Sequence, residues 1–280
     1  MICRYLLVDG ARYPNALARL YNRHEALEVE PLYFDTPWHA AADLGPLLVS
    51  ADADSALLRD IESDAELHAS ATVICSQAPG AAVVSHLRGF NRVADVTGGE
   101  TLLRYADPLV AWFWLSSYSA EALGAVMGPI SEWHIAEPSA VSVQQESPRW
   151  RVFSHAAKPA DPQLRISILG RAQLSALEQA GQLQLKGRLY RWLQQHRPAV
   201  LSSMPEGALD DWLNARLADA SACGLTTERS FAVWCDVSLC EGNDFAAAPQ
   251  GSYQRWLAEQ QVPPAQTPDQ QIQHYYRSVV

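Results

Sequence analysis

Residues 5–11 read Tyr-Leu-Leu-Val-Asp-Gly-Ala and give the first indication of the architecture. The four apolar residues are typical of a short buried strand, and Asp9-Gly10 ends the run because these residue types favour turns. Beyond the turn, Leu17, Leu20 and Tyr21 lie at helical spacing. We therefore predict a strand over residues 5–8 and a helix over about 14–24.

The same alternation continues through the first half of the chain. Apolar runs bounded by Gly and Pro are typical of strands, and apolar residues three or four positions apart are typical of helices. Further strands are predicted at 27–34, 47–50, 72–75, 94–96, 101–105, 132–136 and 150–153, and further helices at 55–67, after Pro79 and from Asp107-Pro108. Such alternation indicates an α/β fold, a mixed sheet with flanking crossover helices.

The second half has a different pattern, with apolar residues at three- and four-residue steps. This pattern predicts helices over about 174–193, 209–220, 231–240, 252–261 and from Thr267. Between the two patterns, the stretch is interrupted by Pro138, Pro148, Pro159 and Pro162. We therefore predict an α/β N-terminal lobe over residues 1–158 and an all-α helical C-terminal lobe over residues 159–280.

Charge is unevenly distributed along the chain. Its 280 residues carry a formal net charge of −10, and residues 1–150 contain 9 Arg against 19 Asp and Glu. An acidic surface repels nucleic acid and anionic lipid and favours basic partners. The longest apolar run, Leu109–Leu115, is far shorter than the ~20 residues that span a bilayer. We expect a cytoplasmic protein with no nucleic-acid partner and no membrane span.

The sequence lacks the common motifs for metals and nucleotides. The five cysteines, at positions 3, 75, 223, 235 and 240, form no Cys-x-x-Cys pair, and the eight histidines form no His-Glu-x-x-His motif. Neither glycine-rich phosphate-binding fingerprint occurs. We expect reduced thiols, no metal site and no cofactor.

Cys75 and His86 are the candidates for catalysis. Cys75 ends a predicted strand just before a helix, whose N-terminal dipole can lower the pKa of a thiol, and His86 follows in that helix. A cysteine-dependent hydrolase or transferase is therefore one hypothesis. The alternative is that Cys75 is a small buried hydrophobic residue, which is the commoner role of a free cysteine at the end of a strand.

The chain contains nine tryptophans, and several fall on predicted helices. Tryptophans pack protein cores, and aromatic residues are also enriched where protein surfaces meet. The candidates for contact with a partner are Trp112, Trp114, Trp192, Trp212 and Trp256. For each of them, core packing is the alternative.

Three charged residues near the middle of the chain also have two interpretations. Arg88, Arg104 and Asp107 either form a charged binding cluster or supply an ion pair and a helix cap. Nothing in their spacing separates these possibilities.

The order of short motifs over about residues 4–135 resembles a known family. The motifs are Tyr5–Ala11, Gly45–Val49, Ser76 ahead of His86-Leu87-Arg88, Leu103–Pro108 and Gly128-Pro129-Ile130. Each is short, but together, in this order and spacing, they are similar to the adaptor-chaperone family of bacterial type VI secretion systems, catalogued as a domain of unknown function (DUF4123). Residues 220–228 and 242–245 resemble the helical module that usually follows this domain.

The resemblance implies a non-enzymatic protein that binds a toxic effector and helps to load it onto the spike protein, of the VgrG type, of the secretion machine. It singles out the motif residues Asp9, Gly10, Gly45, Pro46, Ser76, His86, Leu87, Arg88, Arg104, Asp107, Pro108, Gly128 and Pro129. Leu109 stands where relatives often carry arginine, so a salt bridge made there would be missing here.

A small-molecule sensor that binds at the strand ends is a further alternative.

Overall fold

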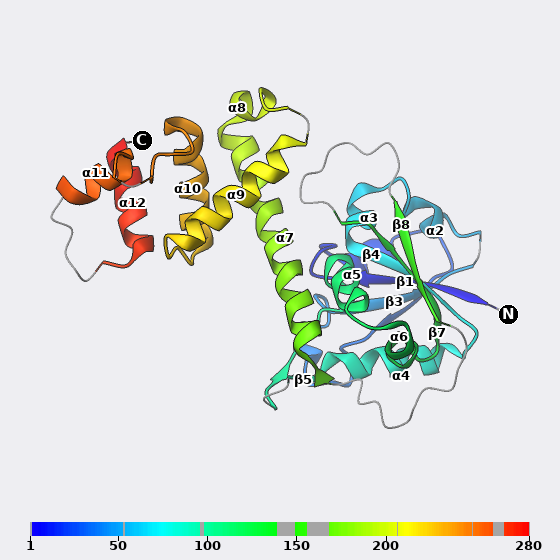
Figure 1. The fold of residues 1–280 in the computed structure, drawn as a ribbon. Coiled ribbons are helices and arrows are strands. Elements are labelled where there is room, and N and C mark those ends of the chain that lie inside the picture. The colour runs from blue at the N-terminus through cyan, green and yellow to red at the C-terminus, as the bar shows by residue number, and fades with distance from the viewer. Residues whose placement is uncertain are drawn as a thin grey trace. The chain divides into compact units, whose positions relative to one another are not determined.

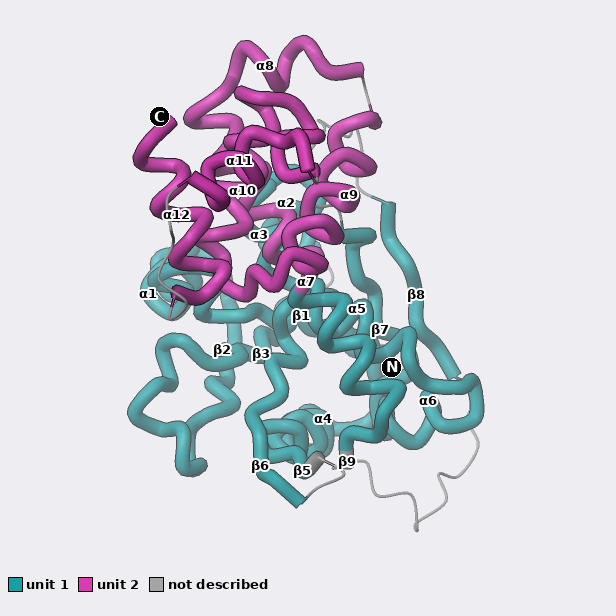
Figure 2. Tube along the Cα trace, turned by 60° about the vertical axis from the view of Figure 1, so that its left-hand side comes forward, with its two compact units in different colours: residues 1–138, 144–181 teal, residues 139–143, 182–280 magenta. Residues whose placement is uncertain are grey.

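The structure is a computed structural model that describes residues 2–52, 54–95, 98–138, 149–155, 168–205, 207–247, 249–259 and 266–279. The chain forms two compact units (Figure 2). Unit 1 comprises residues 1–138 and 144–181, and unit 2 comprises residues 139–143 and 182–280. The lobe boundary predicted between residues 158 and 159 lies outside the described residues.

Unit 1 is built on a six-stranded sheet (Figure 1). The strand order is β2-β3-β1-β4-β7-β8, and every neighbouring pair is antiparallel. The strands are β1 (Cys3–Asp9), β2 (Glu28–Pro31), β3 (Pro46–Ser50), β4 (Ala71–Ser76), β7 (Ile130–Ala136) and β8 (Trp150–Ser154). The strand predicted from residues 5–8 is therefore an interior strand, paired on both sides.

Helices connect strands that run in the same direction without being neighbours. β1 and β2 are both antiparallel to β3, so they run parallel to each other, and α1 (Ala16–Tyr21) connects them. β3 and β4 are both antiparallel to β1, and α2 (Ala56–Asp60) and α3 (Ala65–Ser70) connect them. The predicted crossover helices are therefore present, each passing over one inserted antiparallel strand.

Around residues 5–8 of the central strand β1, the sheet is buried on both faces. Side chains alternate along β1, so that Tyr5 and Leu7 join one core while Leu6 and Val8 join the other. The first core is completed by α4 (Gly80–Arg88), α5 (Pro108–Ser116) and α6 (Ala120–Met127), and the second by α1, α2 and α3. Burial on both faces explains why residues 5–8 of β1 form a continuous apolar run without polar alternation.

Several predicted elements differ from the structure. The strand expected over residues 27–34, for example, is limited to β2, which ends at Pro31. The helix expected over residues 55–67 is interrupted between α2 and α3, because the side chain of Asp64 accepts backbone hydrogen bonds and begins a new helix. The strand expected over residues 101–105 is limited to β6 (Glu100–Thr101). β6 pairs with β5 (Val93–Asp95), which also pairs in parallel with β9 (Ile168–Leu169). The short 3-10 helices are η1 (His39–Ala41) and η2 (Gly89–Asn91).

Unit 2 is helical in its described elements. α7 (Arg171–His196) begins in unit 1 and continues into unit 2, where it is followed by α8 (Pro198–Ser202), α9 (Ala208–Ala222), α10 (Glu228–Glu241), α11 (Ser252–Glu259) and α12 (Pro268–Val279). α10 is central, because Val233 and Val237 join one core and Cys235 joins another. The predicted fold class, an α/β lobe followed by an all-α lobe, is confirmed. None of the helices in the described part of the chain is both long and apolar enough to cross a membrane.

The turn between α6 and β7 depends on a glycine. Gly128 has φ 54° and ψ −114°, a conformation that residues with a Cβ atom rarely adopt. A Cβ atom there would lie 2.5 Å from Cε1 of His86. Nε2 of His86 in turn donates a hydrogen bond to the carbonyl of Val126 at 2.8 Å. Close packing between Gly128 and α4 thus sets the point at which β7 begins beside β4.

We expect Gly128→Ala to lower the free energy of unfolding by about 2–4 kcal/mol, because the methyl group meets the His86 ring and the backbone is strained. Gly89→Ala is the matched control: Gly89 has φ −60°, and an added Cβ would have no atom within 4 Å. Its stability should change by less than about 1 kcal/mol. Urea unfolding measures both variants, and equal stabilities would contradict the packing argument.

Candidate functional site

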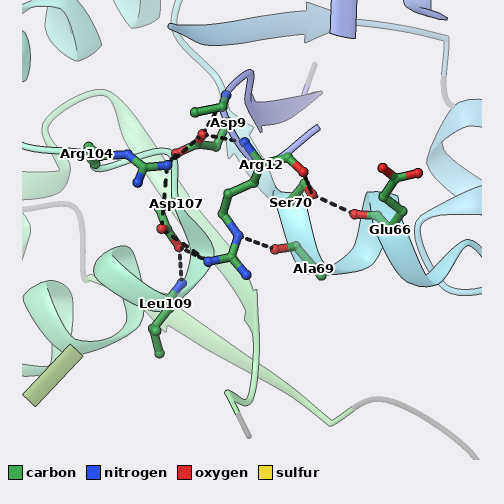
Figure 3. A network of polar contacts seen from close by, with 9 residues as sticks. Asp9, Arg12, Glu66, Ala69, Ser70, Arg104, Asp107 and Leu109 are labelled. Carbon is green, nitrogen blue, oxygen red and sulfur yellow. Dashed lines mark hydrogen bonds and ion pairs between the residues drawn. The ribbon is translucent and has the colours of Figure 1, made fainter. Parts of the chain in front are cut away.

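Two buried carboxylates meet near the carboxyl end of β1 (Figure 3). The first is Asp9, the last residue of β1, whose side chain is 5% exposed. Its Oδ1 atom accepts hydrogen bonds from the backbone N–H groups of Ala11 at 2.9 Å and Arg12 at 3.1 Å. Nη2 of Arg104 donates to Oδ1 at 2.9 Å and to Oδ2 at 2.8 Å. The carboxylate is therefore held by both backbone and side-chain donors.

The second carboxylate, Asp107, is 0% exposed and caps α5. Its Oδ1 atom accepts a hydrogen bond from the backbone N–H of Leu109 at 3.0 Å. Nη1 of Arg12 lies 3.3 Å from both carboxylate oxygens, and Nη2 of Arg104 lies 3.7 Å from Oδ2. The cap predicted at Asp107-Pro108 is confirmed, and Leu109 takes part through its backbone amide.

Arg12 extends this network to the end of α3. Its Nε atom donates to the carbonyl of Ala69 at 3.0 Å, and Oγ of Ser70 donates to the Arg12 carbonyl at 3.1 Å. Three segments that are far apart in the sequence are thereby joined, as Figure 3 shows. Sequence analysis did not predict the role of Arg12, because nothing in its own segment indicates which acid it faces.

The pKa values of Asp9 and Arg104 are shifted by burial and by the neighbouring charges. Burial raises the pKa of Asp9, and the neighbouring Arg104 offsets only part of this effect. Burial by itself would lower the pKa of Arg104, but Asp9 and Asp107 raise it above its ordinary value. The carboxylate oxygens are directed at protein donors, so the arrangement suits a structural clamp better than a general acid or base.

The glycines of the first two motifs make this end of β1 compact. The N–H of Gly10 donates to the carbonyl of Gly45 at 3.0 Å, and a Cβ atom on Gly10 would lie 2.7 Å from that oxygen. A Cβ atom on Gly45 would lie 2.5 Å from the ring of Tyr33. Pro46 begins β3 directly opposite Asp9. These motif residues therefore lie together and serve close backbone packing.

A second cluster of motif residues lies at the other end of the sheet, around Ser76, His86 and Pro129. Oγ of Ser76 donates to the carbonyl of Pro129 at 2.6 Å and accepts from the N–H of Ala78 at 3.0 Å. Leu87 is buried in the core that α4 shares with the sheet. Arg88 lies apart from this cluster, because its ion pair at 2.7 Å is with Glu30 of β2. The cluster fixes the ends of β4, α4 and β7.

The structure does not support a pairing of Cys75 with His86. Ile74 and the apolar side of α4 belong to the same core, so Cys75, the next residue of β4, points to the opposite face of the sheet. Sγ of Cys75 lies 4.0 Å from Nε2 of His134. Burial raises the pKa of the Cys75 thiol, and Glu132 adds to this effect. A thiolate nucleophile would need the opposite shift.

The predicted partner-contacting tryptophans have different environments. Trp114 is fully buried in the core of unit 1, and Trp112 packs edge-on against Phe153. In unit 2, Nε1 of Trp212 donates to Oδ1 of Asn243 at 2.9 Å, and Trp256 packs against Tyr275. Trp192 stacks on its helix neighbour His196 and lines a groove. Only Trp192, among these five, is found in the lining of that groove.

The groove lies in unit 2, between α7, α10 and α12, and has a volume of about 520 Å³. Its apolar lining includes Leu189, Trp192 and Val233. Three exposed arginines and one glutamate also line it: Arg188, Arg229, Arg277 and Glu228. Nε of Arg188 donates to Glu228 at 2.7 Å, which joins α7 to α10. The lining is therefore net positive in a chain whose net charge is −10.

A buried acid holds the helices around the groove. Asp236 of α10 is 1% exposed, and its two oxygens accept hydrogen bonds from Arg197 at 2.6 and 2.9 Å. Oη of Tyr276, which lines the groove, donates to Asp236 at 2.8 Å. Burial tends to raise the pKa of Asp236, but the bonds from Arg197 and Tyr276 hold it below its ordinary value. Burial and Asp236 raise the pKa of Tyr276 to about 12.

One family model matches the chain, and the match lies within unit 1. Residues 4–125 match the model of a family described as a domain of unknown function, DUF4123. The matched segment includes both buried carboxylates and ends before Gly128-Pro129 and the helical unit. Neither a curated protein nor a solved structure matched the chain.

We expect Asp107→Ala to lower the free energy of unfolding by about 2–4 kcal/mol, because it removes a helix cap and leaves Arg12 without its carboxylate. Asp64→Ala is the matched control, since Asp64 caps α3 through the N–H groups of Glu66 and Leu67. That change should cost only about 1 kcal/mol. Chemical denaturation compares the two variants, and equal losses would show that the ion pairs contribute nothing.

A second expectation concerns pH. Because the folded-state pKa of Asp236 is lowered, its network stabilises the protein fully above the unfolded value of about 4 and loses this contribution as pH falls through the lower folded value. The difference in unfolding free energy between the unmodified protein and Asp236→Asn should be constant above about pH 5 and shrink below about pH 4. Denaturant unfolding across this range measures it, and a difference independent of pH would refute the assignment.

Proposed function

We propose that this protein is a non-enzymatic, cytoplasmic adaptor that binds a toxic effector of a type VI secretion system and helps to load it onto a VgrG-type spike protein. The match of residues 4–125 to DUF4123 and the motif order support this role. The observation that carries most weight is that the matched motif residues form a packed framework. A loader requires such a rigid framework and an accessible binding surface, and it requires no reactive centre.

The framework argument rests on how the motif residues are used. The buried carboxylates of Asp9 and Asp107 are held by ion pairs with Arg104, and Asp107 also caps a helix. Gly10 and Gly45 allow close backbone approach, and the Ser76 hydroxyl bridges two strand ends. Each of these contacts positions a strand or a helix of unit 1. The thiol hypothesis has less support, because the side chain of Cys75 points to the face of the sheet opposite α4, which carries His86.

The groove of unit 2 supplies a surface for the effector. Its apolar lining can accept an amphipathic helix or strand, a recurring form of peptide recognition. Its three arginines favour a segment that carries acidic residues among the apolar ones, because complementary charge increases the association rate and orients the partner. We therefore assign effector docking to this groove, with Trp192 as the anchor.

The test uses the full chain and its candidate effector, which we expect a neighbouring gene to encode. Trp192→Ala and the double variant Arg229→Glu/Arg277→Glu should each weaken effector binding by at least about tenfold, with the melting temperature nearly unchanged. Arg191→Glu is the matched control, because Arg191 is exposed on α7 and bonds only to the Gly187 carbonyl of its own helix among the described contacts.

Isothermal titration gives the affinities. Equal weakening by the control and the groove variants would exclude the groove as the docking site. The proposed function itself requires that the unmodified protein bind the toxin and also bind the spike protein. If it binds neither of them, the proposed function is wrong.

A further inference from the structure

Three side chains of types that commonly bind metal ions lie on one face of the sheet. Cys75 of β4 is paired with Glu132 of β7, and Val73 is paired with His134. Because side chains alternate along a strand, Glu132 and His134 share a face, and strand pairing places Cys75 on the same face. This is the face opposite Ile74 and Trp133, which belong to the core that includes α4. The cluster is therefore separate from the motif residues on α4.

The three ligand atoms converge on one another. Nε2 of His134 lies 2.8 Å from Oε2 of Glu132 and 4.0 Å from Sγ of Cys75. One ligand atom from each residue lies within 4.8 Å of the other two. In a tetrahedral zinc site, bonds of about 2.0–2.3 Å place the ligand atoms about 3.3–3.6 Å apart. Side-chain adjustments of less than about 1 Å would bring this cluster to that geometry.

Both neighbours of His134 approach the same ring nitrogen, Nε2. This geometry distinguishes a metal-binding site from a catalytic proton relay. In a catalytic thiol–imidazole–carboxylate relay, the imidazole uses one nitrogen for the nucleophile and the other for the carboxylate. Here both Glu132 and Cys75 approach Nε2 of His134. Three donor atoms directed toward a common point are typical of a metal-binding site, so the geometry does not fit a proton relay.

We propose that Cys75, Glu132 and His134 bind a zinc ion. A thiolate, an imidazole and a carboxylate form a mixed sulfur, nitrogen and oxygen set that suits zinc, whereas magnesium and calcium prefer oxygen ligands alone. Cys75 is buried, and the Glu132 side chain is 48% exposed, which gives the ion a path from solvent. Three protein ligands leave the fourth position to water.

The surroundings set an upper limit on the affinity. Arg4 of β1 is paired with Cys75, so an exposed positive charge lies beside the thiol. The ion must displace the thiol proton and compete with this charge. We therefore expect weaker binding than at a four-ligand structural site. A bound ion would link β4 to β7, and its effect on stability follows from mass action alone. The site is independent of the proposed loading role.

Cobalt(II) and zinc(II) titrations of the full chain, freed of metal by chelation, test the proposal. Cobalt should produce a thiolate-to-cobalt charge-transfer band, and zinc should displace it and raise the melting temperature. Cys75→Ser and His134→Ala should each weaken zinc binding by at least about 100-fold, because removal of outer-shell partners alone costs 10–100-fold. Cys223→Ser is the matched control, since Cys223 is an exposed thiol in unit 2.

Glu132→Gln keeps the test valid if Cys75→Ser or His134→Ala fails to fold, because Glu132 is exposed and its replacement preserves shape. This variant should bind zinc at least about tenfold more weakly. A cobalt spectrum without a thiolate band would overturn the proposal. So would zinc affinities that are unchanged in the Glu132 variant or lowered equally by Cys223→Ser.

Discussion

The clamp formed by Asp9, Arg12, Arg104 and Asp107 is the constraint on which unit 1 depends. Two carboxylates are almost fully removed from water, which is costly for each charge unless donors surround it. The donors come from the turn after β1, from the segment before α5 and from the first turn of α5 itself. The helix can therefore begin at only one place relative to the central strand.

The position of α5 in turn determines how one face of the sheet is covered. From the capped start at Asp107, the helix carries Ala111, Trp114 and Leu115 into the core. The ring of Trp114 packs edge-on against Phe90 and Trp133, so it contacts both the segment after α4 and strand β7. Because buried aromatic side chains contribute large areas to a core, a shift of α5 would disturb contacts on two other elements.

Local features of the sequence were sufficient to predict most elements but few of the contacts between them. The cap at Asp107-Pro108 and the continuous apolar run of β1 are properties of neighbouring residues, so the predictions from them are confirmed. The pairing of Arg12 with Asp107 and the approach of His134 to Cys75 depend on which strands become neighbours. The order of strands in a sheet is a long-range property, and the spacing of residues along the chain does not show which strands become neighbours. The expectation of no metal site rests on local motifs alone, and a cluster formed across two strands has no such motif.

The same physical device recurs in unit 2 with a different consequence. Asp236 is a buried carboxylate on a central helix, and it binds Arg197, which follows α7, and Tyr276 of α12. These are the helices between which the groove lies, and Tyr276 belongs to its lining. Since a buried carboxylate must keep its donors, the separation of α7, α10 and α12 is constrained by one residue that is itself inaccessible to a partner. The buried Asp236 therefore determines the shape of the groove, whereas exposed arginines determine its charge. Mutations can change the shape and the charge separately.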